Sequence, residues 1–297
     1  LLKKMKAMLG AFVGDAAGAV LEFYRQPITE EKALDAMKMP GGGHLRVGSG
    51  QITDDGELTL TLWKSLEESD LFPAYLHWIT KGYSDWYNSC PFDIGMTCSF
   101  AFETYYDLFR NKINSLDECL TLVQNLNGNS EANGALMRAT AIASYIDKHP
   151  NLDIKNGIQL AKDDAKLSHP NIVCQETNMI YVFSLIHLLK GYSPNDTLKL
   201  TDYFINQFIT SNKVKEWYFN ESLDITLMDC KKNVGHVRWG FVLAYYFLRN
   251  SHLSFEEAIK ITLMKGGDTD TNAAIVGGMV GCYKDIPQYM LQPVLSF

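Results

Sequence analysis

Apolar side chains recur along most of the chain at the spacing of an α-helix. From Met5 to Tyr24 they follow the i, i+3, i+4, i+7 pattern without a break, which predicts a first helix of about five turns. The same spacing predicts helices over the segments 57–69, 97–110, 134–148, 176–190, 196–210, 237–250 and 255–264. Alternating strand patterns between turn signals are almost absent. We therefore expect an all-α protein, folded as a single compact domain over residues 1–297.

Turn and capping signals divide these helices from the loops. Ser115-x-x-Glu118 and Ser254-x-x-Glu257 match the capping box, in which a hydroxyl and a carboxylate bind the free amide groups at a helix start. Two irregular regions stand out, the glycine-rich stretch 40–50 and the segment Ser84–Gly95. Long loops in compact helical proteins are usually where ligands bind, so both regions are candidate parts of a site.

Charge and composition exclude several classes of protein. The chain has 297 residues, of which 46% are hydrophobic, so it can bury a large core. Its formal charge of −7 disfavours nonspecific binding to nucleic-acid backbones, which requires a basic face. No apolar run approaches the roughly 18 uncharged residues of a membrane span, so we expect no membrane association.

The cysteines and the N-terminal residues bear on the compartment. Six cysteines are scattered without a C-x-x-C pair, which favours buried free thiols in a reducing, cytoplasmic environment. Lys3, Lys4 and Lys6 precede an apolar run, as in a leader peptide. Asp15 and Glu22 interrupt that run while the helical period continues, so we expect a structural first helix.

Two acidic clusters lie far apart in the sequence. Thr53-Asp54-Asp55 ends the first glycine-rich loop, and Asp268-Thr269-Asp270-Thr271 follows Gly266-Gly267. Each precedes a predicted helix, so each alone is best explained as an N-terminal cap. Together they offer four carboxylates and threonine hydroxyls without His or Cys, a set that hard divalent cations prefer. If the two loops meet, they could hold two Mg²⁺-like ions. Two unrelated helix caps remain the alternative.

The first helix carries two further acids. Asp15 and Glu22 are two turns apart, so they lie on nearly the same helix face, about 10 Å from each other along the axis. Gly14 and Gly18 would allow another backbone to pack close to this face. Two solvated surface acids would explain the segment equally well.

Four blocks of sequence resemble the ADP-ribosylglycohydrolases, a family that includes the dinitrogenase-reductase-activating glycohydrolases and the ADP-ribosyl-acceptor hydrolases. The blocks occur in the family's order and span most of the chain: Gly14-Asp15-Ala16-Ala17-Gly18 with Glu22, Gly50-Gln51-Ile52-Thr53-Asp54-Asp55, Asn133-Gly134-Ala135-Leu136-Met137-Arg138, and Gly266-Gly267-Asp268-Thr269-Asp270-Thr271. The paired T-D-D and G-G-D-T-D-T blocks are specific to this family, whereas any one block alone would be weak evidence.

The resemblance implies an orthogonal multi-helix fold with a binuclear centre of two Mg²⁺, or sometimes Mn²⁺. By this analogy the metal ligands are Thr53, Asp54, Asp55, Asp268, Asp270 and Thr271. The implied reaction is hydrolysis at C1 of the distal ribose, which frees ADP-ribose from a modified protein or a related conjugate. The catalytic carboxylates would come from Asp55, Glu22 and Asp54, with Asp55 or Glu22 as the acid/base. We expect a monomer.

The resemblance also implies substrate contacts. Ser130, Asn133 and Gly134 fall in the segment 128–134, which matches a loop that grips ADP-ribose in the family and which we call the gripping loop. His169 matches a position lining the site. A loop or capping role for His169 is an equal alternative. For Arg138 a buried pair with a carboxylate is favoured over substrate contact. The Asp93-Ile94-Gly95 loop matches a variable element that shapes the ribose or phosphate pocket.

Two positions depart from the family pattern. Gly56 stands where many relatives have Thr, and Glu131 introduces a negative charge into the gripping loop. The missing Thr hydroxyl at Gly56 bears on the binding of water or metal. The charge of Glu131, near the expected position of a diphosphate, leaves the identity of the substrate undetermined. Two other functions are also open: a catalytically silent ADP-ribose binder or crystallin-like structural member, and a metal-dependent hydrolase of another nucleotide or glycoside.

Overall fold

The computed structural model describes residues 5–69 and 75–297, and these residues form fifteen α-helices and one short 3-10 helix. Within those ranges the chain has isolated β-bridges but no strand, which confirms the all-α prediction. The helices, in chain order, are α1 (Lys6–Ala19), α2 (Glu30–Ala36), α3 (Asp54–Glu68), α4 (Tyr75–Asn88), α5 (Met96–Phe109), α6 (Leu116–Asn127), α7 (Thr140–Lys148), α8 (Ile154–Lys166), α9 (Ile172–Leu189), α10 (Pro194–Phe208), α11 (Asn212–Phe219), η2 (Glu221–Leu223), α12 (Val237–Arg249), α13 (Phe255–Met264), α14 (Thr269–Gly281) and α15 (Gln288–Ser296).

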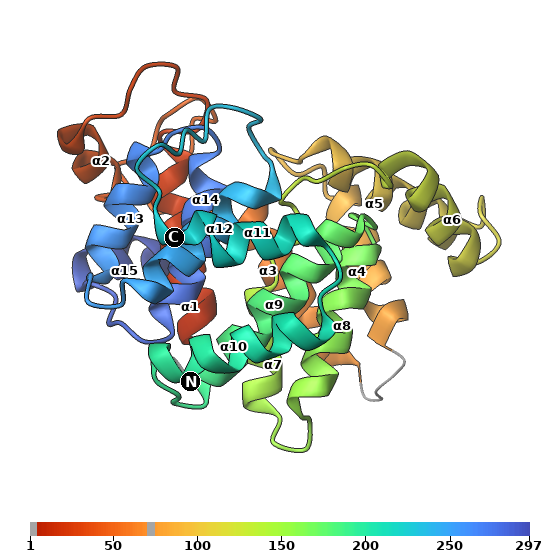
Figure 1. The fold of residues 1–297 in the computed structure, drawn as a ribbon. Helices are drawn as coiled ribbons and strands as arrows, with labels where there is room; N and C mark the ends of the chain where they lie inside the picture. The colour runs from red at the N-terminus through yellow and green to blue at the C-terminus, as the bar shows by residue number, and fades with distance from the viewer. Residues whose placement is uncertain (1–4, 70–74) are drawn as a thin grey trace.

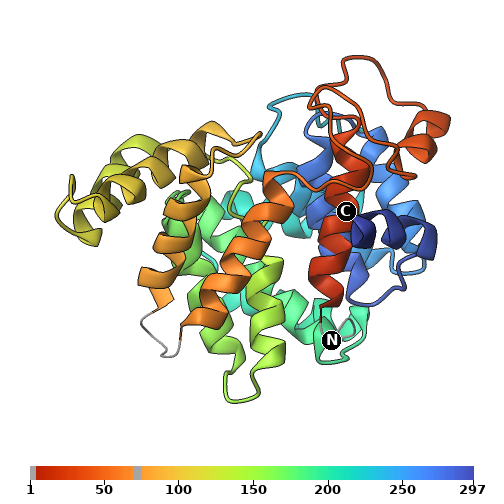
Figure 2. The same cartoon turned by 180° about the vertical axis from the view of Figure 1, so that it is seen from behind.

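The first helix and the fourteenth, from opposite ends of the sequence, lie side by side at the centre of the molecule (Figures 1 and 2). Both are buried along nearly their whole length and consist mostly of small residues. A Cβ on Gly14 would lie only 2.0 Å from the carbonyl oxygen of Ala273, and one on Gly18 only 2.4 Å from Cα of Asp270. Glycine at these positions therefore lets the two backbones touch.

The other helices surround this pair. On one side α3, α4, α7, α8 and α9 pack against one another, and α5 and α6 project from them as an arm (Figure 2). On the other side α12 and α13 pack directly on α14. This arrangement brings the starts of α3 and α14 close to the end of α1, where the acidic residues lie.

Helix α9 meets the length and composition of a membrane span, contrary to the expectation that no segment would. It is 18 residues long with a mean hydropathy of 1.3, but 72% of it is buried inside the protein. Its apolar surface is covered by neighbouring helices, as in the core helix of a helical protein.

Several predicted boundaries differ from the structure. The first helix ends at Ala19 rather than near Tyr24, because the chain turns there and Phe23 adopts a left-handed backbone conformation with φ of 58°. The segment predicted as a helix from residue 134 forms turns until α7 begins at Thr140. Helix α4 extends to Asn88, into the segment predicted as irregular. Lys3 and Lys4 lie outside the described residues.

Candidate metal centre and substrate cavity

The two acidic clusters meet in space. The hydroxyl of Thr271 lies 3.2 Å from Oδ2 of Asp55, although the two residues come from opposite ends of the chain. Thr53 and Asp268 occupy the N-cap positions of α3 and α14, yet neither side chain forms a capping hydrogen bond with described residues. The alternative of two unrelated caps is therefore wrong. Both helix starts, with their partial positive charge, face a shared group of carboxylates.

Asp15 on α1 holds the start of α3 in place through hydrogen bonds. Its carboxylate accepts hydrogen bonds from the backbone N–H of Thr53 (3.0 Å) and Gly56 (2.9 Å) and from the Thr53 hydroxyl (2.9 Å). Asp15 is completely buried, so the alternative of a solvated surface acid is wrong for this residue. A Cβ on Gly56 would lie 2.9 Å from Asp15 Oδ2 and 2.7 Å from the Ile52 side chain. Glycine therefore fits position 56 because Asp15 and Ile52 fill the space beside it.

Two sets of three carboxylates are spaced to hold cations. Asp15, Asp55 and Asp270 form one set, and Glu22, Asp268 and Asp270 form the other, with the oxygens of each set within 4.8 Å of one another. Asp55 Oδ1 and Glu22 Oε2 are buried and have no hydrogen-bond partner among the described residues. Unpartnered carboxylate oxygens are rare in protein interiors unless something positive binds them. The donor set, which is all oxygen, thus fits hard divalent ions.

Burial raises the pKa of these carboxyl groups in the metal-free protein. It raises the pKa of Asp15 to about 7, against hydrogen bonds from Thr53 and Gly56 that favour the charged form. Burial, then the negative charges of Asp268, Asp93 and Asp54, raise the pKa of Glu22 to about 8. The pKa values of Asp54, Asp55 and Asp270 lie well above the usual range, first through burial and then through neighbouring acids. A site that holds so many acids favours a bound cation.

A cavity of about 370 Å³ opens beside these groups, and we call it the acidic cavity. Five acids line it: Glu22, Asp54, Asp93, Asp268 and Asp270. Asp93 belongs to the Asp93-Ile94-Gly95 loop, all of which faces the cavity, and the Gly95 N–H lies 3.4 Å from Asp54 Oδ2. Thr53 and Asp55 lie behind the cavity wall, whereas Thr271 reaches it.

Most of the predicted substrate residues belong to the wall of this cavity. Asn133, Gly134 and His169 all line the acidic cavity. The Asn133 side-chain amide donates to Asp268 Oδ2 at 2.8 Å, so it connects the gripping loop to the acidic cluster. Ser130 does not line the cavity; its hydroxyl lies 3.1 Å from that of Thr97, which does. Contact of Ser130 with substrate stays a prediction.

Two basic side chains near this wall have structural roles. Arg138 is fully buried, donates from Nε to Asp164 at 3.0 Å and binds the carbonyl of Gly134 at 2.9 Å, as the buried-pair interpretation predicted. Nδ1 of His169 lies 2.8 Å from the Ser168 hydroxyl, which Arg138 also binds. Burial, and then the charge of Arg138, lower the pKa of His169 to about 3. His169 therefore faces the cavity as a neutral ring.

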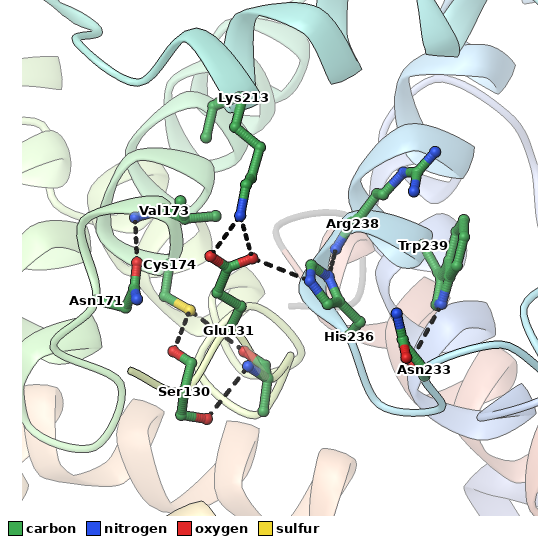
Figure 3. Close-up of polar contacts among 12 residues, drawn as sticks. Ser130, Glu131, Asn171, Val173, Cys174, Lys213, Asn233, His236, Arg238 and Trp239 are labelled. Carbon is green, nitrogen blue, oxygen red and sulfur yellow. Dashed lines mark hydrogen bonds and ion pairs between the residues drawn. The ribbon is translucent and has the colours of Figure 1, made fainter. Parts of the chain in front are cut away.

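Glu131 does not present an uncompensated charge to the substrate. Its carboxylate lies 2.7 Å from Lys213 Nζ on α11 and 3.0 Å from Nε2 of His236, just before α12 (Figure 3). Its backbone carbonyl accepts from the N–H of Val237 at 2.9 Å. These contacts tie the gripping loop to α11 and α12. The repulsion expected between Glu131 and a diphosphate is therefore reduced by the charge of Lys213, whereas burial lowers the pKa of His236.

Some residues of the site were not identified from the sequence as site residues. Asp93 stood in a loop without a role of its own, and the contact of Asp15 with Thr53 depends on how α1 meets α3. Phe23, which lines the acidic cavity although it is half exposed, gave no signal because a single aromatic residue after a helix is common.

Comparisons with known proteins agree with this architecture. The family model for ADP-ribosylglycohydrolases matches residues 3–296. A protein of Acanthamoeba polyphaga mimivirus, whose name places it among the ADP-ribosyl glycohydrolases, is 27% identical over 99% of this chain and 91% of its own. The ADP-ribosyl-[dinitrogen reductase] glycohydrolase of Rhodospirillum rubrum is 27% identical over 96% and 87%.

The fold is found in a solved structure as well. A chain of an ADP-ribosylglycohydrolase-related protein complex superposes with a TM-score of 0.75 over 99% of this chain and 94% of that one, at 22% identity. At this identity the likeness concerns the fold alone. The family assignment rests on the sequence match, which covers nearly every residue, and on the names of the relatives. This chain belongs to the ADP-ribosylglycohydrolase family.

Proposed function

We propose that the protein is a metal-dependent hydrolase that removes ADP-ribose from modified protein side chains by cleaving the bond at C1 of the distal ribose. The observation that carries this proposal is the pair of three-carboxylate sets that share Asp270 and adjoin a cavity large enough for a sugar. The unpartnered oxygens of Asp55 and Glu22 belong to these sets.

Two Mg²⁺ ions, or Mn²⁺, would be held by the six predicted ligands: Thr53, Asp54, Asp55, Asp268, Asp270 and Thr271. Asp15 would keep Thr53 and Asp55 in place through the three groups that donate to it. When bound, such ions hold ribose hydroxyls and lower the pKa of water.

Glu22 is the better candidate for the catalytic carboxylate than Asp55. Glu22 lines the acidic cavity and is only partly buried, whereas Asp55 lies behind the wall in contact with Thr53 and Thr271. Glu22 would accept a proton from the attacking water as the oxygen of that water bonds to C1. The bond from C1 to the acceptor breaks through an oxocarbenium-like centre, and the acceptor keeps the electron pair and gains the proton that Glu22 took from the water.

Asn133, Gly134 and His169 would bind the rest of ADP-ribose. They line the same cavity as Glu22, so one ligand can touch all four residues. Because His169 is neutral, it can bind a hydroxyl or phosphate oxygen without adding charge. Ser130 would join these contacts at the edge of the loop.

The first test is release of ADP-ribose from proteins or peptides modified at serine or at arginine, followed by chromatography. We expect release with Mg²⁺, loss of release with EDTA, and loss of both metal binding and release in Asp55→Asn. Failure to release ADP-ribose from any linkage, with bound metal verified by calorimetry, would overturn the proposal. Tight binding of ADP-ribose without turnover would favour the catalytically silent alternative, and faster cleavage of free nucleotides would favour a different hydrolase.

A second variant separates the roles of the two acids. Glu22→Gln should lower kcat by about 10²- to 10⁴-fold, the usual contribution of a general base, with a loss of Mg²⁺ affinity by calorimetry that is smaller than in Asp55→Asn. A loss of Mg²⁺ affinity as large as that of Asp55→Asn would instead make Glu22 a metal ligand.

The protein's surroundings follow from smaller observations. All six cysteines lie within the described ranges as free thiols; five are buried as predicted but Cys90 is exposed, and from the cysteine pattern in the sequence we propose a reducing, cytoplasmic location. We also propose that the chain acts as a single-domain monomer, because all the acids of the site come from one chain.

A further inference from the structure

A second pocket, of about 500 Å³, adjoins the acidic cavity, and we call it the Phe23 pocket. Its walls come from the turn after α1, from the glycine-rich loop and from the loop before α12. The side chains that matter for its chemistry are Phe23, Tyr24, Arg25, His44, Lys231 and Val234. Phe23 and Val234 also line the acidic cavity, so the two spaces adjoin at these residues.

Phe23 is held at the boundary between these spaces in an unusual way. Its backbone has φ of 58°, a left-handed conformation that costs a bulky residue of order 1 kcal/mol. Nevertheless 53% of Phe23 is exposed, and its ring forms a T-shaped contact with the ring of His44, with ring centroids 5.3 Å apart. Burial of Phe23 thus does not account for the strained turn. Strain of this kind concentrates at sites that bind ligands.

The Phe23 pocket has the opposite charge to the acidic cavity. Arg25 and Lys231 are exposed and form no ion pair with any described residue, and no acid lines the pocket. The nearby Asp35 is already paired with Lys38 at 2.7 Å, and Asp229 accepts the backbone N–H of Lys231. In a chain with a formal charge of −7, two free cations beside a cavity lined by five acids make a local positive site.

We infer that the Phe23 pocket binds the acceptor side of the substrate and favours protein segments that carry acidic residues next to the ADP-ribosylated side chain. This inference rests on the proposed function. Phe23 directly follows Glu22 and lines both spaces, so the Phe23 pocket receives the acceptor beside Glu22, while Asn133 and Gly134 bind the ADP-ribose within the acidic cavity. Phe23 and Val234 contact the aliphatic part of the modified side chain, and Arg25 and Lys231 bind flanking carboxylates.

The test uses three peptides that have the same ADP-ribosylated residue and the same linkage but glutamate, glutamine or lysine on either side. We expect kcat/KM in the order glutamate, glutamine, lysine. Two exposed ion pairs correspond to roughly a 2- to 30-fold preference for glutamate over glutamine. This preference should fall as salt screens the charges.

Variants connect the preference to the pocket. In Arg25→Gln/Lys231→Gln the ratio of kcat/KM between the glutamate and glutamine peptides should fall to about one. The matched control, Lys155→Gln/Lys162→Gln on α8, removes the same charge far from the pocket and should keep the ratio of the unchanged protein. Thermal melting of each variant checks that the fold is intact.

The outcomes separate the inference from the proposed function. Equal hydrolysis of all three peptides would overturn the inference and leave the proposed function standing. A preference that survives in Arg25→Gln/Lys231→Gln would also overturn it. Hydrolysis of an ADP-ribosylated oligonucleotide faster than any peptide, dependent on the same two residues, would replace the acidic protein acceptor by a nucleic acid. Hydrolysis of none of these substrates would overturn both.

Discussion

At the scale of single residues, Asp15 shows how a buried acid can hold the start of a neighbouring helix in place. It is fully buried, does not line the acidic cavity, and binds three donor groups of Thr53 and Gly56. Those contacts fix the direction of the first turn of α3, on which Asp54 and Asp55 lie. The position of the predicted ligands therefore depends on a residue in another helix.

Replacing this carboxylate should weaken metal binding. In Asp15→Asn, the side-chain NH₂ is itself a donor and cannot accept hydrogen bonds from Thr53 and Gly56. The start of α3 should therefore shift. We expect a 10- to 100-fold loss of Mg²⁺ affinity, about the usual effect of residues that hold metal ligands, measured by calorimetry. Asp117→Asn, an exposed acid on α6, is the control and should bind Mg²⁺ unchanged. Unchanged affinity in Asp15→Asn would contradict this role.

Arg138 supports the cavity wall in the same indirect way. It is fully buried against Asp164 and holds the carbonyl of Gly134. Arg138→Met removes one partner of a buried ion pair and leaves Asp164 uncompensated, so we expect a loss of about 3–5 kcal/mol in the free energy of unfolding. Urea denaturation measures it. A loss below about 1 kcal/mol, as for an exposed pair, would show that Asp164 finds other partners.

The residues of the acidic clusters are predictable from the sequence, but what surrounds them is not. Adjacent carboxylates near glycines are visible as letters, so Asp54, Asp55, Asp268 and Asp270 form a recognisable group in the sequence alone. The role of Asp15 cannot be predicted from the sequence, because it depends on the angle at which α1 passes α3. The pairing of Glu131 cannot be predicted from the sequence either, because its partners Lys213 and His236 lie about 80 and 100 positions away.

At the scale of elements, the contact between α1 and α14 joins the two halves of the centre. Gly14 and Gly18 on α1 face Ala273 and Asp270 on α14 with no room for a side chain. Helices this close are rigidly placed relative to each other, because any rotation would bring backbone atoms into collision. The spacing of Asp15 from Asp270 is therefore set by the backbones themselves, whereas Glu22 lies in the turn after α1.

A single methyl group should disturb this contact. Alanine is intrinsically better than glycine in a helix, but in Gly14→Ala its Cβ would lie 2.0 Å from a carbonyl oxygen of α14. We expect a loss of at least about 1–3 kcal/mol in stability by urea denaturation, together with weaker Mg²⁺ binding. Asn206→Ala, at an exposed position of α10, should cost nothing measurable. A Gly14→Ala protein as stable as the original would mean that the two helices can separate.

The existence of helices was predictable, whereas their ends were less so. Apolar spacing continues through residues 20–24, but the chain leaves the helix there because Phe23 takes a left-handed conformation. Apolar residues likewise fill 134–139, which the structure shows as turns that carry Asn133 and Gly134 to the cavity. In both places the departure from the local pattern coincides with the site, where tertiary contacts override periodicity.

At the scale of the whole molecule, the buried acids should make stability depend on pH and metal together. The folded protein raises the pKa of Asp15 to about 7 and of Glu22 to about 8, from ordinary values near 4. Groups with a raised pKa stabilise the fold fully at low pH, and this stabilisation is lost as pH rises through the folded values. Without metal, the protein should therefore become less stable between about pH 7 and 8.

Melting temperatures test this expectation. In EDTA, Tm should fall from about pH 7 to 8, a window in which His169 is mostly neutral in both the folded and the unfolded state. With Mg²⁺ in excess, the fall should disappear, because bound cations compensate the carboxylates that ionise. A Tm that stays constant or rises with pH in EDTA would contradict the assignment of these pKa shifts.

The pairing of α1 with α14 also has a consequence for how the protein is made. A ribosome delivers Asp15, Glu22, Asp54 and Asp55 early, and Asp268 and Asp270 only when about nine-tenths of the chain has been synthesised. Until then no nascent chain can assemble either three-carboxylate set, since both include Asp270. A chain that ends before Asp270 would therefore lack one carboxylate of each set, and the face of α1 that α14 covers would be open to water.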